Sequence, residues 1–179
     1  MKILCFGDSN TCGYDPRGFF GGYYDKPWPW ILAENTNWIV KNCGENGREI
    51  PGFSVSFAEN YDLLMIMLGT NDLLQGNSVE DVAKRMEAFL LSLQLEKSNI
   101  LLIAPPHMKP GHWVTEVSLI EASKELSLSY QALAQRIGVR FVNAGEWDVP
   151  LAFDGVHFTE SGHRVFAEGI LQYLVREGV

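Results

Sequence analysis

"KILCFGDSN", residues Lys2 to Asn10, changes abruptly in character near its middle. Its first five residues are mostly apolar and predict a buried strand, which ends at Gly7. Asp8, Ser9 and Asn10 follow directly, and residues of these types favour turns and helix N-caps. The stretch therefore predicts a strand that passes through a polar turn into a helix.

The same kind of apolar run recurs along the chain, and helical patterns lie between the runs. Strands are predicted at Lys2–Phe6, Trp38–Asn42, Leu63–Leu68, Ile100–Ala104 and Arg140–Val142, most of them apolar on both faces. Helices are predicted around Trp30–Glu34, Val79–Leu93 with Ser78 as its N-cap, Glu116–Arg136 and Glu160–Arg176. This alternation predicts an α/β fold, with helices on both faces of a parallel sheet. Without a repeat or linker, residues 1–179 are expected to form one domain.

The composition limits the classes of partner. The chain has 179 residues, 46% hydrophobic and 20% charged, which suits one sizeable core. It carries 14 basic and 22 acidic residues, a net charge of −8, and no run of Lys or Arg. Nucleic acid and anionic membrane surfaces are therefore not expected as partners. No stretch approaches the roughly 18 apolar residues of a membrane span. A small molecule or another protein is expected instead, and a homo-oligomer stays open.

The cysteine and histidine residues give no sign of a disulfide framework or a metal site. Cys5, Cys12 and Cys43 form no CxxC pair, which predicts reduced thiols. The N-terminus has too short an apolar run for a signal peptide, so a cytoplasmic protein is expected. The histidines lack ligand spacing, and neither a metal nor another cofactor is predicted.

Further polar segments follow other predicted strands, namely Asn42–Arg48, Gly69–Asp72 and Asp154–His157. In an open parallel sheet, ligands bind beyond the carboxyl ends of the strands, so these segments should meet at one edge. Together they offer a hydroxyl, glycine-containing turns, a side-chain amide and an Asp/His pair. Acyl transfer uses these groups, because a serine needs a histidine base, which a carboxylate orients. The oxyanion needs donors already in place, such as the Asn71 amide and the Gly47 N–H.

Four of these motifs, in order along nearly the whole chain, resemble those of the SGNH (GDSL-type) hydrolases. They are Gly7-Asp8-Ser9-Asn10, with Asn10 where the family usually has Leu, then Asn42-x-Gly44-x-x-Gly47, Gly69-Thr70-Asn71-Asp72 and Asp154-x-x-His157. The resemblance implies a three-layer α/β/α fold with a five-stranded, flavodoxin-like parallel sheet.

The resemblance also implies a role for each matching residue. Ser9 would be the nucleophile and His157 the base, which Asp154 orients. The backbone N–H groups of Ser9 and Gly47, with the Asn71 amide, would form the oxyanion hole. Asp8 is expected to be structural, holding the turn.

A serine esterase that needs no metal is therefore expected. It would act through an acyl-enzyme on acyl esters of small alcohols, sugars or aryl alcohols. A thioesterase or lysophospholipase of the same family stays open as an alternative. A doubly wound flavin- or nucleotide-binding module is the alternative from another class, but the first strand–helix turn lacks GxGxxG and the chain lacks GxxxxGK[ST]. An α/β-hydrolase is disfavoured because GxSxG is absent.

Two long loops, Asp8–Pro27 and Pro105–Thr115, are expected to be functional. Aromatic residues of the first loop and the segment after it are expected to divide between core and pocket, with Trp28 and Trp30 mostly packing; a subunit contact is the alternative. This set comprises Tyr14, Phe19, Phe20, Tyr23, Tyr24, Trp28 and Trp30. His163 is expected to cap or pack. His107 and His112 are expected to be solvated, and contact of one of them with substrate is the alternative. Cys12 and Cys43 are expected to be small buried hydrophobes beside the site.

Overall fold

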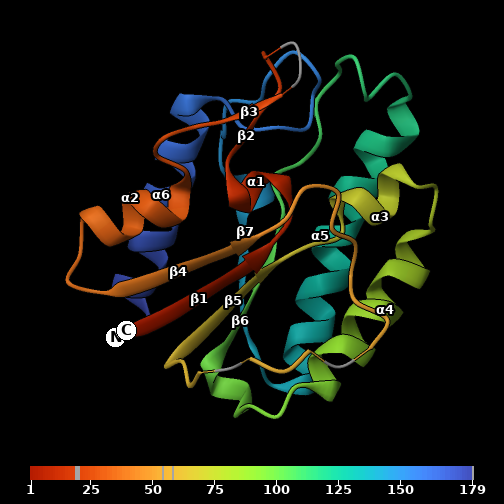
Figure 1. Cartoon of the computed structure of the whole chain (residues 1–179). Helices are drawn as coiled ribbons and strands as arrows, with labels where there is room; N and C mark the ends of the chain where they lie inside the picture. The colour runs from red at the N-terminus through yellow and green to blue at the C-terminus, as the bar shows by residue number, and fades with distance from the viewer. Residues whose placement is uncertain (19–20, 54, 58, 179) are drawn as a thin grey trace.

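A five-stranded parallel sheet forms the centre of the computed structural model, which describes residues 1–18, 21–53, 55–57 and 59–178 (Figure 1). The strand order is β4-β1-β5-β6-β7, so the winding direction reverses at β1, as in flavodoxin-like sheets. The strands are β1 (Lys2–Gly7), β4 (Ile39–Gly44), β5 (Leu63–Met67), β6 (Ile100–Ala104) and β7 (Arg140–Asn143). All five predicted strands are confirmed, with ends that differ by no more than two residues.

Helices cover both faces of the sheet and make three layers (Figure 1). Helices α2 (Trp28–Glu34) and α6 (Glu160–Arg176) lie on one face, and α3 (Thr70–Leu74), α4 (Val79–Ser92) and α5 (Val117–Ile137) lie on the other. Alternate side chains of each strand point to opposite faces. In β1, Ile3 and Cys5 pack in the cluster that contains α2 and α6, whereas Leu4 and Phe6 pack in the cluster of α4 and α5. The predicted α/β/α arrangement is confirmed.

Strand β4 departs from the pattern of a strand buried on both faces. It lies at the edge of the sheet, and 67% of Ile39 is exposed. The sequence run Trp38–Asn42 does not reveal this, because an edge strand can carry the same β-branched residues as a central one. Just after β4, the chain stays beside the end of β1, where the Glu45 N–H donates to the Gly7 carbonyl at 3.1 Å.

The beginning of α4 agrees with the predicted capping chemistry. Ser78 caps α4, since its Oγ accepts a hydrogen bond from the Asp81 N–H at 3.1 Å. Helix α2 begins at Trp28 rather than at the predicted Trp30, with Pro29 in its first turn, where proline is tolerated. Among the described residues, no helix is long and apolar enough to cross a membrane.

Short elements were not predicted because they are too short to show a period. They are α3, the hairpin of β2 (Tyr14–Asp15) and β3 (Gly22–Tyr23), and the 3-10 turns η1 (Lys97–Asn99) and η2 (Ala144–Glu146). Helix α1 (Ser9–Cys12), which follows β1, was predicted without bounds. The predicted loop 105–115 contains no helix or strand.

The aromatic residues of the first loop and α2 have different environments. Trp28 is buried in the core, as expected. The expectation that Trp30 mostly packs is wrong, because 38% of it is exposed and the Lys26 ammonium lies 4.0 Å from its ring centroid. Phe19 and Phe20 lie outside the described residues.

Candidate active site

The carboxyl ends of β4, β1 and β5 are neighbours, so the polar segments that follow them meet at one edge of the sheet. Strand β1 passes directly into α1, which begins at Ser9. Asp8 is the N-cap of this helix, and its Oδ1 accepts a hydrogen bond from the Asn10 N–H at 3.0 Å. The predicted strand, turn and helix in this stretch are confirmed, and Asp8 holds the turn.

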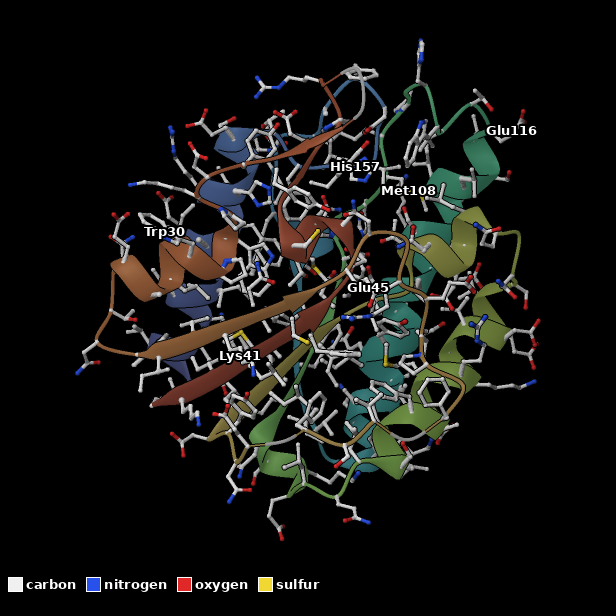
Figure 2. The ribbon with its side chains drawn as sticks, viewed as in Figure 1. Trp30, Lys41, Glu45, Met108, Glu116 and His157 are labelled. Atoms are coloured by element: carbon white, nitrogen blue, oxygen red, sulfur yellow. The ribbon has the colours of Figure 1, made fainter. Side chains whose placement is uncertain are left out.

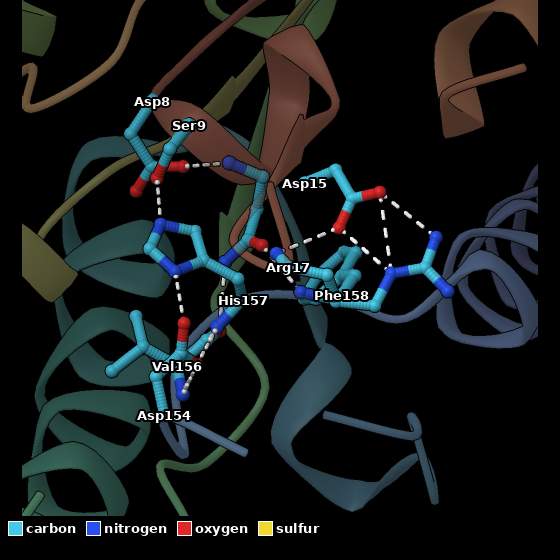
Figure 3. A network of polar contacts seen from close by, with 9 residues as sticks. Asp8, Ser9, Asp15, Arg17, Asp154, Val156, His157 and Phe158 are labelled. Atoms are coloured by element: carbon cyan, nitrogen blue, oxygen red, sulfur yellow. Dashed lines mark hydrogen bonds and ion pairs between the residues drawn. The ribbon is translucent and has the colours of Figure 1, made fainter. Parts of the chain in front are cut away.

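Ser9, His157 and Asp154 form a continuous chain of polar contacts (Figure 3). His157 Nε2 lies 3.0 Å from Ser9 Oγ, and His157 Nδ1 lies 2.7 Å from Asp154 Oδ2. The other carboxylate oxygen, Oδ1, accepts the N–H groups of Val156 and His157, both at 2.9 Å. All three side chains belong to buried residues, with Ser9 the most exposed at 5%. Two residues that are 148 positions apart thus lie within hydrogen-bonding distance.

The surroundings of Asp154 favour its ionised form. Burial alone would raise the pKa of this carboxyl, but the hydrogen bonds from the His157 ring and from the His157 and Val156 N–H groups outweigh it. The net effect is a lowered pKa for Asp154. An ionised Asp154 fixes the proton of His157 on Nδ1 and leaves Nε2 as an acceptor for the Ser9 hydroxyl.

The second long loop, 105–115, supports the loop that carries Asp154. Trp113 N–H donates to the Asp154 carbonyl at 3.0 Å, and Lys109 N–H donates to the Gly155 carbonyl at 3.0 Å. Gly111 allows the two loops to approach closely, because a Cβ there would overlap the backbone of Asp154 and Gly155.

Asn71 and Gly47 stand at the ends of the two strands beside β1. Asn71 is the second residue of α3, and its Nδ2 donates to the Arg48 carbonyl at 3.0 Å. Gly47 has a φ of 72°, in the left-handed region that favours glycine. Because the Asn71 amide holds the residue after Gly47, the two predicted oxyanion donors are fixed relative to each other.

Arg48 fastens the segment that follows β4, residues 45–50, to the end of β1. Its guanidinium donates to the carbonyls of Gly7, at 2.9 Å, and Cys43, and it also contacts the Glu45 carboxylate at 2.6 Å. The guanidinium lies 4.3 Å from the Phe6 ring centroid. These contacts tie the segment containing Gly47 to the turn that leads into Ser9.

Asp72 holds the far end of the segment 45–50, at Ile50. It is fully buried, 3.0 Å from the Arg85 guanidinium, and accepts the Ile50 N–H at 3.2 Å. Burial raises the pKa of Asp72, while Arg85 acts against this rise. The sequence motif points to Asp72 but not to Arg85, whose helical pattern gives no sign of this contact.

Two aromatic rings flank His157. The Tyr14 and Trp113 ring centroids lie 4.8 and 4.9 Å from that of His157. Trp113 is 52% exposed. Tyr14 belongs to the predicted aromatic set and Trp113 lies in a loop predicted to be functional, but nothing in the sequence singles out Trp113 itself. The only available signal was an aromatic residue in a long polar loop.

The remaining histidines do not join this chain of contacts. His107 Nε2 lies 3.2 Å from Ser127 Oγ, and burial lowers the pKa of His107. The His112 ring packs near Phe153, with 5.8 Å between ring centroids. His163 is fully buried and packs against Tyr24, as the packing hypothesis predicted. In the described part of the chain, no group of three or more His, Cys, Asp or Glu residues is arranged to hold a metal ion.

The cysteines and Asp8 complete the surroundings of the site. All three cysteines are free thiols, but Cys12 and Cys43 are only half-buried, so the expectation that both are buried is wrong. Cys12 Sγ lies 2.9 Å from Asn46 Oδ1, and burial raises the pKa of this thiol to about 11. Burial also raises the pKa of Asp8 to about 6, against the opposing effect of the Asn10 N–H.

Such an arrangement is suited to nucleophilic catalysis. A hydroxyl hydrogen-bonded to an imidazole, itself oriented by a carboxylate, can lose its proton as it attacks a carbonyl carbon. The side-chain amide and backbone N–H groups at the neighbouring strand ends are donors of the kind that stabilise an oxyanion.

Comparisons with known proteins identify the class. Residues 5–165 match the model of the GDSL-like Lipase/Acylhydrolase family, and the chain belongs to this family. A search among curated proteins found no match.

Solved structures share the fold over nearly the whole chain. The aryl esterase of M. smegmatis is 24% identical with a TM-score of 0.81, and the alignment covers 98% of each chain. A carbohydrate acetylesterase family member from Sinorhizobium meliloti is 24% identical with a TM-score of 0.77, over 98% of this chain and 97% of that one. A member of the lipolytic protein G-D-S-L family from Veillonella parvula is 22% identical with a TM-score of 0.78, over 98% and 99%.

Proposed function

We propose that this protein hydrolyses carboxylic acyl esters of small alcohols, sugars or aryl alcohols through an acyl-enzyme on Ser9. The observation that carries the proposal is the chain of contacts from Ser9 Oγ through His157 to Asp154, at 3.0 and 2.7 Å. These are hydrogen-bonding distances for a nucleophile, its base and the group that orients the base. The family relationship supports the same chemistry.

In the first half-reaction, Ser9 Oγ attacks the carbonyl carbon of the ester while His157 Nε2 takes the hydroxyl proton. The carbonyl oxygen becomes an oxyanion, which the N–H groups of Ser9 and Gly47 and the Asn71 amide stabilise. When the tetrahedral intermediate collapses, His157 gives its proton to the departing alcohol oxygen. An acyl group then remains on Ser9 Oγ.

In the second half-reaction, water replaces the alcohol. His157 removes a proton from the water as its oxygen attacks the acyl carbon, and the same donors stabilise the second oxyanion. Collapse of this intermediate returns the proton to Ser9 Oγ and releases the carboxylic acid. Asp154 stays ionised throughout and stabilises the imidazolium.

The rings beside His157 favour a leaving group with a flat or apolar face. Because His157 must reach the departing oxygen, the alcohol leaves from the space near Tyr14 and Trp113. Aromatic rings stack on aryl groups and cover apolar faces. M. smegmatis aryl esterase and the S. meliloti carbohydrate acetylesterase family member are named for related substrates.

We also propose that the reaction needs no metal and that the protein works in a reducing compartment such as the cytoplasm. The proposed chemistry assigns every proton transfer and oxyanion contact to the chain's own groups. The three free thiols fit a compartment in which disulfides do not persist.

Labelling with a fluorophosphonate tests the assignment of Ser9. The wild type should be labelled and hydrolyse nitrophenyl acetate, whereas Ser9→Ala should show neither activity. Ser161→Ala is a matched control, because Ser161 is an exposed serine in the first turn of another helix. Labelling that persists in Ser9→Ala, or is lost in Ser161→Ala, would contradict the assignment.

A substrate panel tests the substrate class. Nitrophenyl esters from acetate to palmitate, run beside an acyl-CoA, separate an esterase of short acyl groups from a lipid esterase and a thioesterase. The proposal predicts the highest kcat/KM with a short acyl ester. A higher value with the acyl-CoA would assign the protein to the thioesterases instead.

A further inference from the structure

Asn10 joins the helix that carries Ser9 to the loop that carries His157. Its Nδ2 donates to the Val156 carbonyl at 3.1 Å, and its Oδ1 accepts the Phe158 N–H at 2.8 Å. One amide side chain therefore holds the backbone immediately before and immediately after His157. Only 4% of Asn10 is exposed, so water does not readily replace either bond.

Other bonds to this loop do not fix its distance from Ser9. Asp154 Oδ1 accepts the N–H groups of Val156 and His157, and the His157 carbonyl accepts the Ala152 N–H at 2.7 Å. These partners all lie within one loop, so they set its internal shape. The bonds from loop 105–115 hold the same loop from another side and do not involve α1.

Three hydrogen bonds connect α1 with the His157 loop among the described residues. One is the Ser9–His157 contact itself, and Asn10 makes the other two. Asn10 is also the next residue after Ser9, in the first turn of a helix capped by Asp8. A displacement of the His157 backbone relative to Ser9 must therefore stretch at least one bond to Asn10.

We propose that Asn10 is a positioning residue, whose amide fixes the His157 backbone relative to Ser9 and so keeps Nε2 within reach of Oγ. The inference rests on the proposed function, because it concerns how the nucleophile and its base are held together. Asn10 itself does not touch the reacting atoms. Its effect is on the alignment of His157, to which proton transfer is sensitive.

Asn10→Leu tests this role, because leucine has a similar size but neither donates nor accepts a hydrogen bond. Loss of alignment should lower kcat about 10- to 100-fold, the scale expected when a reacting group is misplaced by about 1 Å. The KM for nitrophenyl acetate should change little, because both polar atoms of the Asn10 amide are bonded to the His157 loop. The rate of fluorophosphonate labelling of Ser9 should fall in parallel with kcat.

Thr36→Val is a control matched in hydrogen bonds. Thr36 Oγ1 donates to the Leu32 carbonyl at 2.7 Å and accepts the Trp38 N–H at 3.2 Å, near the beginning of β4 and thus at the opposite end of the sheet. This variant also loses one donated and one accepted bond to backbone. It should lose stability while its kcat and labelling rate stay at the wild-type values.

A purely structural role for Asn10 gives a different result. In that case Asn10→Leu, assayed below its unfolding temperature, would lose stability like Thr36→Val but keep its kcat, and the inference would be overturned. Loss of all activity in Ser9→Ala together with a normal kcat in Asn10→Leu would refute only this inference. Retention of activity in Ser9→Ala would refute the proposed function.

Two further measurements apply if Asn10→Leu does not fold. Asn10→Asp keeps the shape and the acceptor for Phe158 N–H but loses the donor to the Val156 carbonyl, so it should also have a reduced kcat. In the wild type, amide hydrogen exchange should show a protected Phe158 N–H. Exchange of this N–H as fast as in an open loop would contradict the bond to Asn10, and a folded Asn10→Asp with normal kcat would overturn the inference.

Discussion

Burial of His163 should make a pH-dependent contribution to the stability of this protein, which a variant can isolate. His163 is fully buried in α6, with the Tyr24 and Phe158 ring centroids 5.2 and 5.3 Å from its own. Its Nδ1 accepts the Trp28 N–H at 3.3 Å, and its Nε2 has no partner among the described residues. Burial lowers the pKa of His163 from 6.5 to about 4.

The direction of the effect follows from proton binding. Between pH 6.5 and about 4, the unfolded chain binds a proton at His163 that the folded chain does not. The contribution of His163 to the free energy of unfolding should therefore be constant above this window and fall as pH is lowered through it. The shift in pKa corresponds to about 3 kcal/mol when complete, and about 2 kcal/mol of this is lost by pH 5.

Asp8 makes a contribution of the opposite sign to the pH dependence of the free energy of unfolding. Its pKa is raised from 3.8 to about 6, so the folded chain takes up a proton at Asp8 before the unfolded chain does. This uptake stabilises the folded state by about 3 kcal/mol as pH falls from about 6 to 3.8. The two buried groups thus nearly offset each other in the wild type, and only a variant separates them.

His163→Asn removes the titration while its side-chain oxygen can still accept the Trp28 N–H. Urea unfolding at about pH 7.5 and pH 5 should show that the variant gains about 2 kcal/mol relative to the wild type on acidification. His112→Asn, at an exposed histidine, is the control and should follow the wild type. Parallel pH dependences of His163→Asn and the wild type would contradict the assignment of this loss of stability to His163.

Three further predictions concern activity. Asn71→Ala should lower kcat about 10²- to 10³-fold with a smaller change in KM, because an oxyanion donor acts mainly in the transition state; a normal kcat in steady-state assays would show that Asn71 only holds Arg48. Trp113→Ala should raise the KM of a nitrophenyl ester about 3- to 10-fold, as expected for a lost ring contact, and that of an aliphatic ester less; equal changes would remove Trp113 from the leaving-group site. Dialysis against EDTA should leave kcat/KM unchanged, and a loss that a divalent ion restores would overturn the metal-independent mechanism.

The periodic elements could be predicted from the sequence, whereas the aromatic residues could not be assigned. Apolar runs and helical spacing depend on burial of whole segments, so β6 was predicted at its actual bounds and α6 likewise. A single aromatic side chain carries no such period. Trp28 and Trp30 lie two positions apart in one short helix and therefore point in different directions. Trp28 points into the core, whereas Trp30 is partly exposed with the Lys26 ammonium over its ring.

Motifs identified the groups that could react, because acyl transfer requires particular residue types. The side chains that hold those groups in place cannot be found from residue type in the same way, because their partners are backbone groups. Arg48 donates to the carbonyl of Gly7, and Asn10 bonds to the backbone on both sides of His157. Backbone carbonyls and N–H groups occur all along any chain, so they do not mark particular positions. No spacing rule can therefore select these contacts in advance.

Burial distinguishes two interpretations of Asn10, a solvated turn residue and a buried link to the His157 loop. In the sequence, an asparagine after Asp and Ser has the ordinary interpretation of a turn or capping residue, whose amide would face water. In the folded chain, Asp8 is the cap, and the Asn10 amide is buried with both of its polar atoms bonded to the His157 loop. A buried amide is costly unless its hydrogen bonds are made, so the pairing that satisfies Asn10 also restricts where His157 can lie. The same physical requirement that stabilises the fold at this point thus holds the proposed base, His157, beside the proposed nucleophile, Ser9.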